Sequence, residues 1–149
     1  MPRKAVLLVE DNPDDELLTL RAFRKHNLSN AIDVTRSGAE ALDYLFATGE
    51  YADRDINDQP QVVLLDLNLP KIGGLEVLRR LRDDERTRML PVVVLTSSKE
   101  ERDLVDSYRF GCNSYVRKPV NFDEFLEATL QLGLYWLILN EAPPQTHTR

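Results

Sequence analysis

The segment Val62–Gly74, VVLLDLNLPKIGG, constrains the fold of this chain more strongly than any other stretch. Its four leading apolar residues run without alternation into Asp66, a pattern typical of a strand buried on both faces of a parallel sheet. An unpaired carboxylate inside such a layer carries a large desolvation cost. We therefore expect Asp66 at the carboxyl end of its strand, where open α/β sheets bind ligands. Taken alone, the segment fits an aspartate that only begins a turn equally well.

Further apolar runs, each followed by a helical pattern, repeat this arrangement along the chain. We expect strands at 5–9, 31–35, 62–65, 91–95 and 114–117. Helices are expected at about 12–26, after Ser37, after Gly74, at about 99–110 and from Asn121 to about Asn140. Strands and helices that alternate with short links imply a mainly parallel sheet covered on both faces. The predicted class is α/β, with one doubly wound five-stranded sheet.

Polar residues stand where the expected strands end. The first strand is followed by Glu10 and Asp11, the third by Asp66, the fourth by Thr96 and the fifth by Lys118. Because parallel strands end at one edge of a sheet, we expect these side chains to converge. The acidic excess calls for a divalent cation, and oxygen ligands without histidine or cysteine suit Mg²⁺. The sequence predicts a Mg²⁺-dependent phosphoryl site with Asp66 as the candidate nucleophile.

The composition argues against several other classes of protein. The chain has 149 residues and a net charge of −6, and no basic run is long enough to attract DNA directly. No apolar run approaches the ~20 residues of a membrane span, and the N-terminal run is too short for a signal peptide. The single cysteine, Cys112, excludes an internal disulfide and fits a reducing compartment. A cytoplasmic protein without membrane association is expected.

Three local patterns give further expectations. The stripe of the first helix expected to be buried consists of Leu17, Leu18, Ala22 and Phe23. Ser37 and Glu40 have the spacing of a capping box at the start of the second helix. The polar stretch 49–60 is longer than the usual link between a helix and a strand, and we favour a surface insertion over a partner-binding loop.

Four motifs, LLVEDN, LLDLNLPKIGGLEVL, PVVVLTSS and SYVRKP, resemble in order and approximate spacing those of response-regulator receiver domains of two-component signalling. The resemblance implies the (βα)5 receiver fold with the flavodoxin-like strand order 2-1-3-4-5. Residues 1–149 would form one receiver domain, with a core at about 4–135 and an extended C-terminal helix and tail at 136–149. Such a protein catalyses its own phosphorylation and dephosphorylation but is not a turnover enzyme.

By matching position, the resemblance implies roles for the residues at the strand ends. Asp66 would accept a phosphoryl group from a phosphohistidine of a sensor histidine kinase, Thr96 would bond the new phosphate, and Lys118 would ion-pair with it. Tyr115 matches the aromatic switch position of the family, although a core aromatic is its default interpretation. Pro119 would follow a cis peptide bond.

The resemblance also implies a set of Mg²⁺ ligands. These are Asp11, Asp66, the backbone carbonyl of Asn68, and Glu10 either directly or through water. One departure from the family pattern is visible, because Gly73-Gly74 stands where the family often has Asp-Gly. That departure affects only the detail of the loop.

A narrower resemblance connects the chain with phytochrome-associated single-domain regulators. The shared features are the long polar insert, the sequence DLNLPK and an extended apolar final helix that contains Trp136. The implied kinase would include phytochrome-type photoreceptor kinases. No output domain is expected after the last helix, so the signal would pass to a downstream protein or a phosphotransfer partner.

Two other classes of function are weighed against the phosphorylation switch. A Mg²⁺-dependent phosphatase with an aspartyl nucleophile needs a second aspartate two residues further on, where this chain has Asn68, and it usually carries a cap domain. A receiver-like interaction module that has lost phosphorylation should lack an acidic residue, the threonine or the lysine, and this chain keeps them all. The phosphorylation switch is therefore preferred.

The end of the last helix predicts a homodimer. Leu132–Leu139 reads LGLYWLIL and is apolar at all but one position, whereas an amphipathic surface helix shows only one apolar stripe. If this segment projects past the sheet, an apolar patch is exposed that consists of Tyr135, Trp136, Leu137 and Leu139. Pairing of two such helices about a two-fold axis would cover it. The alternative is that the chain folds back and buries these residues.

Overall fold

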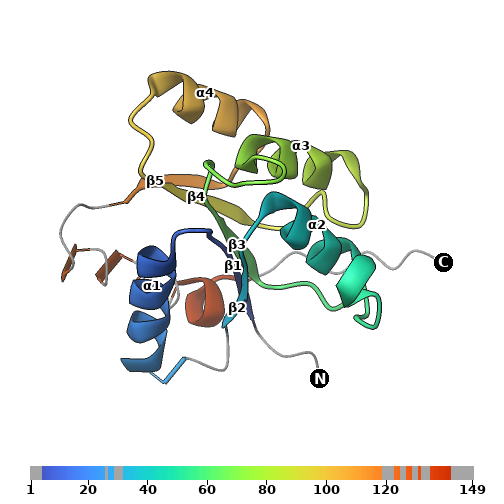
Figure 1. Ribbon diagram of the computed structural model, residues 1–149, viewed down its shortest axis with the longest axis horizontal. Coiled ribbons are helices and arrows are strands. Elements are labelled where there is room, and N and C mark those ends of the chain that lie inside the picture. The colour runs from blue at the N-terminus through green and yellow to red at the C-terminus, as the bar shows by residue number, and fades with distance from the viewer. Residues whose placement is uncertain are drawn as a thin grey trace.

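A five-stranded parallel sheet forms the centre of the molecule (Figure 1). The structure is a computed structural model, and it describes residues 5–25, 27–28, 32–118, 123–124, 127–128, 131 and 135–141. The strands are β1 (Val6–Val9), β2 (Ile32–Thr35), β3 (Val62–Leu65), β4 (Val92–Thr96) and β5 (Ser114–Arg117). Their order is β2-β1-β3-β4-β5, and all neighbouring pairs are parallel. The predicted fold class and strand order are confirmed.

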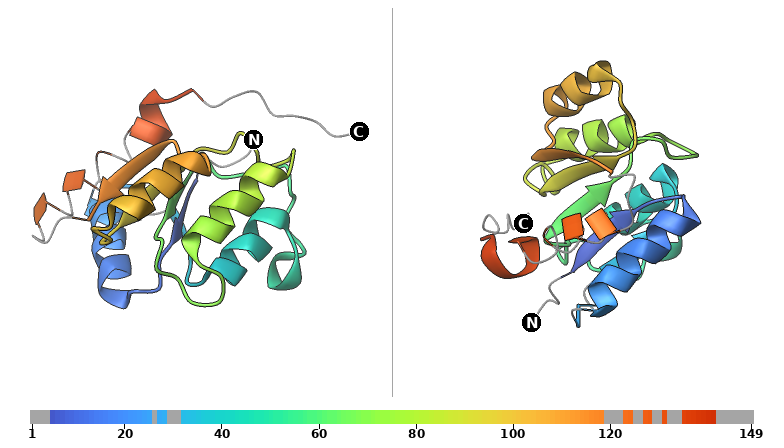
Figure 2. Two further views of the ribbon diagram at one scale, coloured as in Figure 1. Left: turned by 90° about the horizontal axis from the view of Figure 1, so that it is seen from above. Right: turned by 90° about the vertical axis from the view of Figure 1, so that its left-hand side faces the viewer.

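Helices cover both faces of the sheet (Figures 1 and 2). They are α1 (Pro13–Lys25), α2 (Gly38–Phe46), α3 (Gly74–Asp83) and α4 (Glu101–Arg109), with short turns of helix at η2 (Gly49–Tyr51) and η3 (Tyr135–Leu139). Among the described residues, no helix is long and apolar enough to cross a membrane.

Alternation along the buried strands divides the core into two clusters. In β1, Leu7 and Val9 pack with residues of α2 and α3, whereas Val6 and Leu8 pack on the opposite face with Phe23 of α1. All four β1 residues are at most 2% exposed. This continuous burial is the reason that the strands carry unbroken apolar runs.

Helix α1 differs from the expected packing at Leu17, which is exposed, and at Leu18, which is only half-buried. Ala22 and Phe23 are buried as predicted, but Leu17 is 48% exposed and Thr19 is buried instead, at 1%. The Thr19 hydroxyl donates a hydrogen bond of 2.8 Å to the carbonyl oxygen of Asp15, so its burial leaves no polar group unpaired. The prediction of a buried Leu17 was wrong because the buried side of α1 runs through Thr19, Ala22 and Phe23, and residues two positions apart in a helix lie on different sides.

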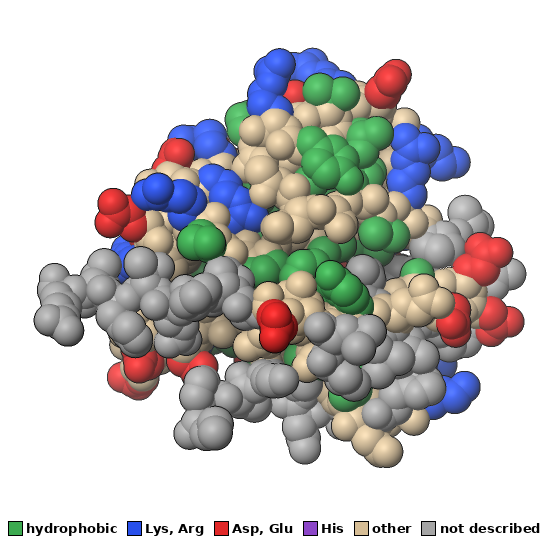
Figure 3. All heavy atoms as spheres, turned by 180° about the vertical axis from the view of Figure 1, so that it is seen from behind, with side chains coloured by type: hydrophobic (Ala, Val, Ile, Leu, Met, Phe, Trp, Pro, Cys, Tyr) green, Lys and Arg blue, Asp and Glu red, His purple; other side chains and the backbone are tan. Residues whose placement is uncertain are grey.

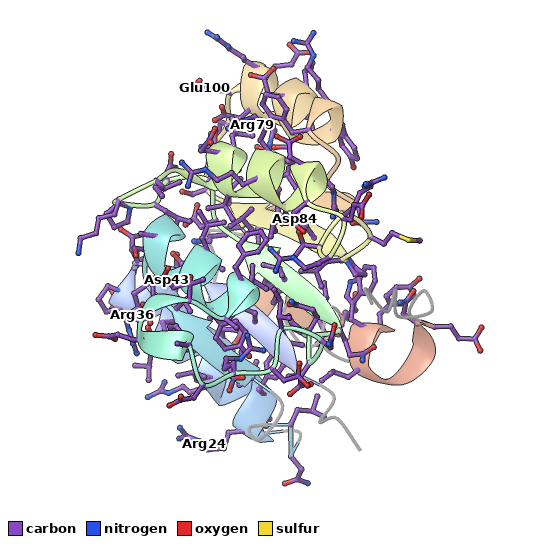
Figure 4. All side chains as sticks on the ribbon, turned by 90° about the vertical axis from the view of Figure 1, so that its right-hand side faces the viewer. Arg24, Arg36, Asp43, Arg79, Asp84 and Glu100 are labelled. Atoms are coloured by element: carbon purple, nitrogen blue, oxygen red, sulfur yellow. The ribbon has the colours of Figure 1, made fainter. Side chains whose placement is uncertain are left out.

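The start of α2 is capped largely as the sequence predicts. The Glu40 backbone N–H donates to Ser37 Oγ at 3.0 Å. The Glu40 carboxylate reaches back one residue further than in a standard capping box and accepts from the Arg36 N–H at 2.9 Å. Arg36, labelled beside α2 in Figure 4, also forms a two-pronged ion pair with Glu16 of α1 at 2.8 and 2.9 Å. The β2–α2 turn is therefore tied to α1.

The insert at 49–60 is packed against α2 and forms a surface insertion. The guanidinium of Arg54 lies 3.8 Å from the centre of the Tyr44 ring and donates to the Tyr44 carbonyl. Tyr51 donates to Glu40 at 2.6 Å, and the Gln59 side-chain amide donates to the Leu45 carbonyl at 2.8 Å.

The C-terminal segment folds back onto the sheet instead of projecting past it. Trp136 is 8% exposed and Leu137 is 6% exposed, because both pack into the cluster that contains Val6 and Leu8. Their expected exposure was wrong, whereas Tyr135 is 47% exposed as expected. The Leu139 side chain, the cap at Asn121 and the peptide bond before Pro119 lie outside the described residues.

Because Trp136 and Leu137 are buried, the continuous apolar patch on which the expected homodimer was based is not present. The homodimer stays a prediction. In the face seen in Figure 3, hydrophobic side chains of the described residues gather near the centre, and basic ones lie mainly toward the edges.

Gly74 allows α3 to begin directly against the loop that follows Asp66. A Cβ atom at Gly74 would lie 2.3 Å from the Asp66 carbonyl oxygen and 2.8 Å from Leu67 Cα, whereas at Gly73 the nearest atom would be 3.7 Å away. The Gly74 N–H also donates to the Leu67 carbonyl at 3.0 Å. The second glycine is thus required by the fold, and the first is not.

We expect Gly74→Ala to lower the free energy of unfolding by about 1–3 kcal/mol, because the backbone around Asp66 must move to admit the methyl group. Gly73→Ala, the matched control, should change it by less than about 1 kcal/mol, since the space there is open and only the helix cap is altered. Urea denaturation of both variants measures the difference. Equal losses would contradict the close approach.

Candidate functional site

Backbone pairing brings the predicted site residues to one edge of the sheet. The Asp66 N–H donates to the Val9 carbonyl at 3.1 Å, so the ends of β3 and β1 are adjacent. The Lys118 N–H donates to the Thr96 carbonyl at 2.8 Å, which joins the ends of β5 and β4. The predicted convergence of strand-end side chains is therefore present.

Asp66 is buried at 6% exposure and is held through both carboxylate oxygens. Its Oδ1 accepts from the Thr96 hydroxyl and from the Asn68 backbone N–H, each at 3.1 Å. Its Oδ2 accepts from Lys118 Nζ at 3.0 Å. Burial alone would raise the pKa of Asp66, but the charge of Lys118 and hydrogen bonding with Glu10, Lys118 and the Asn68 backbone outweigh it and keep the pKa below its usual value. Asp66 is therefore ionised at neutral pH, as a nucleophile requires.

Lys118 lies at the centre of a group of three carboxylates. Its Nζ is 2.5 Å from Glu10 Oε1, 2.7 Å from Asp15 Oδ2 and 3.0 Å from Asp66 Oδ2, and its side chain is only 6% exposed. Burial alone would lower the pKa of Lys118, but these partners raise it above its usual value. The lysine therefore carries a permanent positive charge inside the site.

Asp15 is the member of this group that the sequence did not identify. It stands in the first turn of α1, where acidic residues are favoured by the helix dipole alone. The signal that could have found it is its position in the loop–helix junction directly after Glu10-Asp11.

Glu10 is almost fully enclosed, with 2% exposure. Its Oε2 accepts from the Asn12 backbone N–H at 3.3 Å, and Oε1 contacts Lys118. Burial raises the pKa of Glu10 to about 8, with Lys118 acting in the opposite direction and Asp66 adding to the rise. The raised pKa shows that Lys118 alone does not offset the burial of the Glu10 carboxylate beside Asp66, which favours an additional cation when Glu10 is ionised.

The residues present fit a divalent cation of the Mg²⁺ type. Carboxylate oxygens of Glu10, Asp11 and Asp66 lie within 4.8 Å of one another, and Asp11 is exposed to solvent. Carboxylates with access to water are the ligands that Mg²⁺ prefers. Asn68 follows Asp66 by two residues and is exposed, and its carbonyl stays a predicted ligand.

A chain of hydrogen bonds leads from Asp66 to α4. Thr96 Oγ1 donates to Asp66 and accepts from the Ser98 N–H at 3.2 Å, and Ser98 Oγ donates to Asp103 Oδ2 of α4 at 2.5 Å. Tyr115 is half-buried beside this chain, and its hydroxyl oxygen is buried without a hydrogen-bond partner. Burial raises the pKa of the Tyr115 hydroxyl.

A parallel sheet in the order 2-1-3-4-5 that gathers acidic residues, a threonine and a lysine around an aspartate at the end of β3 defines a receiver-type α/β protein. Comparison with known proteins agrees. The chain belongs to the response regulator receiver domain family, whose model matches residues 6–130.

Response regulator Rcp1 of Synechocystis is 34% identical over 136 residues, which cover 91% of this chain and 90% of Rcp1. The crystal structure of its Mn²⁺-bound form has a TM-score of 0.86 at 33% identity and covers 95% of this chain and 99% of that one. The phosphorylated cyanobacterial phytochrome response regulator RcpA has a TM-score of 0.87 at 35% identity, with the same coverage. The bacteriophytochrome response regulator AtBRR is 54% identical, with a TM-score of 0.71 and coverage of 93% and 98%. The resemblance to phytochrome-associated regulators is confirmed.

Because the buried hydroxyl of Tyr115 has no hydrogen-bond partner, its removal should not lower the free energy of unfolding. Tyr115→Phe should leave the free energy of unfolding unchanged or raise it by up to about 1 kcal/mol, because it removes a buried hydroxyl that makes no hydrogen bond. The control is Tyr44→Phe, which loses a 2.6 Å hydrogen bond to Asp33 and should lower the free energy of unfolding by about 1–3 kcal/mol. Urea denaturation measures both, and a comparable loss in Tyr115→Phe would refute the assignment.

Proposed function

We propose that this chain is a single-domain response regulator that accepts a phosphoryl group on Asp66 and thereby switches the binding of a partner. The observation that carries the proposal is the setting of Asp66, which is ionised, hydrogen-bonded to Thr96 and Lys118, and grouped with Glu10 and Asp11. The domain would span residues 1–149, with its core at about 4–135.

The reaction follows from these contacts. An Asp66 carboxylate oxygen attacks the phosphorus of a phosphohistidine, so that an O–P bond forms, the N–P bond breaks and the imidazole keeps the bonding electrons. The Lys118 ammonium and the Thr96 hydroxyl already point at Asp66 and can stabilise negative charge on the transferred group. Mg²⁺ held by Glu10, Asp11, Asp66 and the Asn68 carbonyl would neutralise charge on the phosphoryl oxygens.

The relatives support this proposal in two respects. Rcp1 has been crystallised with Mn²⁺ and RcpA in a phosphorylated form. Both are similar to this chain over 95% of its length. The phosphoryl donor would be a sensor histidine kinase. RcpA is a cyanobacterial phytochrome response regulator and AtBRR a bacteriophytochrome response regulator, which supports a phytochrome-type photoreceptor kinase as the donor. The signal would continue through a downstream protein or a phosphotransfer partner, and a homodimer stays part of the proposal.

The switch would involve Thr96 and Tyr115. A phosphate on Asp66 adds acceptor oxygens that draw the Thr96 hydroxyl away from its present geometry. Because Thr96 also accepts from the Ser98 N–H, its movement is transmitted to the start of α4. The Tyr115 hydroxyl has no bond to lose and can repack as the loop moves.

The aspartyl-nucleophile phosphatase is the less favoured alternative. Its general acid would occupy the position of Asn68, whose amide cannot supply a proton to a leaving group. The phosphorylation-independent module is disfavoured because the acidic residues, Thr96 and Lys118 are all present and in contact.

Asp66→Asn should abolish phosphorylation by acetyl phosphate or by a phosphorylated sensor kinase, because the amide is not a nucleophile. Wild type treated with a chelator of divalent cations should also remain unlabelled. The control is Asp83→Asn on α3, a side chain that is 67% exposed and lies in the Arg79 ion pair. Phosphate-affinity electrophoresis reports the labelled fraction, and full labelling of Asp66→Asn would exclude the mechanism.

Lys118→Ala should still accept some phosphate but should not reach the activated arrangement, because the ion pair with the phosphate is missing. Amide NMR spectra with and without beryllofluoride, a phosphoryl mimic, measure the change. The exposed Lys99→Ala serves as the control and should behave as wild type. If Lys118→Ala showed the wild-type spectral changes, the lysine would have no part in the switch.

A further inference from the structure

Asp15 brings a carboxylate to the site from a helix instead of from a strand end. Its Oδ2 lies 2.7 Å from Lys118 Nζ, and its side chain is 23% exposed, against 2% for Glu10 and 7% for Asp66. An ammonium group has three N–H donors, and each carboxylate takes one of them. The donors of Lys118 are therefore fully used by these three acids.

Glu10 and Asp66 are each placed to contact two cations, Lys118 and a divalent metal ion. Glu10 and Asp66 belong both to the carboxylate cluster that fits a divalent ion and to the ion pairs of Lys118. A divalent ion and an ammonium that share ligands repel each other across a short distance. Asp15 stands outside the cluster, so it is the one partner of Lys118 that the ion does not need.

The local structure fixes the Asp15 carboxylate in this position. Asn12 caps α1, because its Oδ1 accepts from the N–H groups of Asp14 at 2.9 Å and Asp15 at 3.2 Å. The Asp15 carbonyl accepts from the Thr19 hydroxyl one turn later. Asp14 has the same charge and the same capped turn but is exposed, and within the described part of the chain its side chain makes no ion pair.

We propose that Asp15 is a positioning residue that holds Lys118 in place while Glu10 and Asp66 turn to a divalent cation. The inference rests on the proposed function in one respect, since it takes the acidic cluster to bind such an ion. Loss of the Asp15 carboxylate would leave Lys118 with Glu10 and Asp66 alone. The lysine would then compete directly with the cation for both ligands.

Binding of Mn²⁺ to the unphosphorylated protein tests this proposal, with the free ion measured by electron paramagnetic resonance. Asp15→Asn should weaken Mn²⁺ binding by about three- to ten-fold, because it removes one charge and frees the lysine to compete. Asp14→Asn removes the same charge from the same turn and should weaken binding less than about two-fold. Asp15→Glu, which restores the carboxylate, should recover most of the affinity.

The possible results separate the positioning role of Asp15 from the existence of the metal site. Equal weakening in Asp14→Asn and Asp15→Asn would reduce the effect to general charge and overturn the positioning role, as would unchanged affinity in Asp15→Asn. Absence of Mn²⁺ binding by the wild type would instead refute the metal site of the proposed function. Thermal unfolding of all variants shows whether they are folded. If Asp15→Asn is not folded, Mn²⁺ binding by Asp15→Glu still tests the role of the carboxylate.

Discussion

Lys118 makes the acidic edge of the sheet possible. Without an enclosed cation, the buried carboxylates of Glu10 and Asp66 would repel each other in a setting that water barely reaches. The lysine approaches from β5, on the far side of β4, and therefore joins the ends of three strands and the first turn of α1. The charge of this buried ammonium is a main reason that Asp66 stays ionised in a setting where burial alone would raise its pKa.

The parallel order of the strands and the residues at their ends were predictable because each buried strand is an unbroken apolar run that stops at a polar residue. Burial on both faces enforces the run, and the desolvation cost of a charge enforces its end. Asp66, Thr96 and Lys118 therefore stand out in the sequence. The contact of Asp15 with Lys118 does not, because it spans 103 positions and depends on how α1 is oriented.

The errors have a common cause in tertiary packing. A helical stripe that included Leu17 was the natural expectation, but the buried side of α1 includes Thr19, whose hydroxyl is hydrogen-bonded within the helix. The apolar run Leu132–Leu139 similarly fits an exposed patch or a buried one, and only the three-dimensional course of the chain distinguishes them. Trp136 and Leu137 are buried against the sheet face that α1 also covers.

Trp136 is the only tryptophan of the chain, and its burial gives the protein an intrinsic optical probe. Indole emission depends on the polarity around the ring, and this ring shares a cluster with Val6 and Leu8 of β1, the strand that leads to Glu10. The fluorescence of Trp136 therefore reports whether residues 136 and 137 are packed against the core, without any added label. Observed together with phosphorylation, it would separate events at the acidic edge from events at the end of the chain.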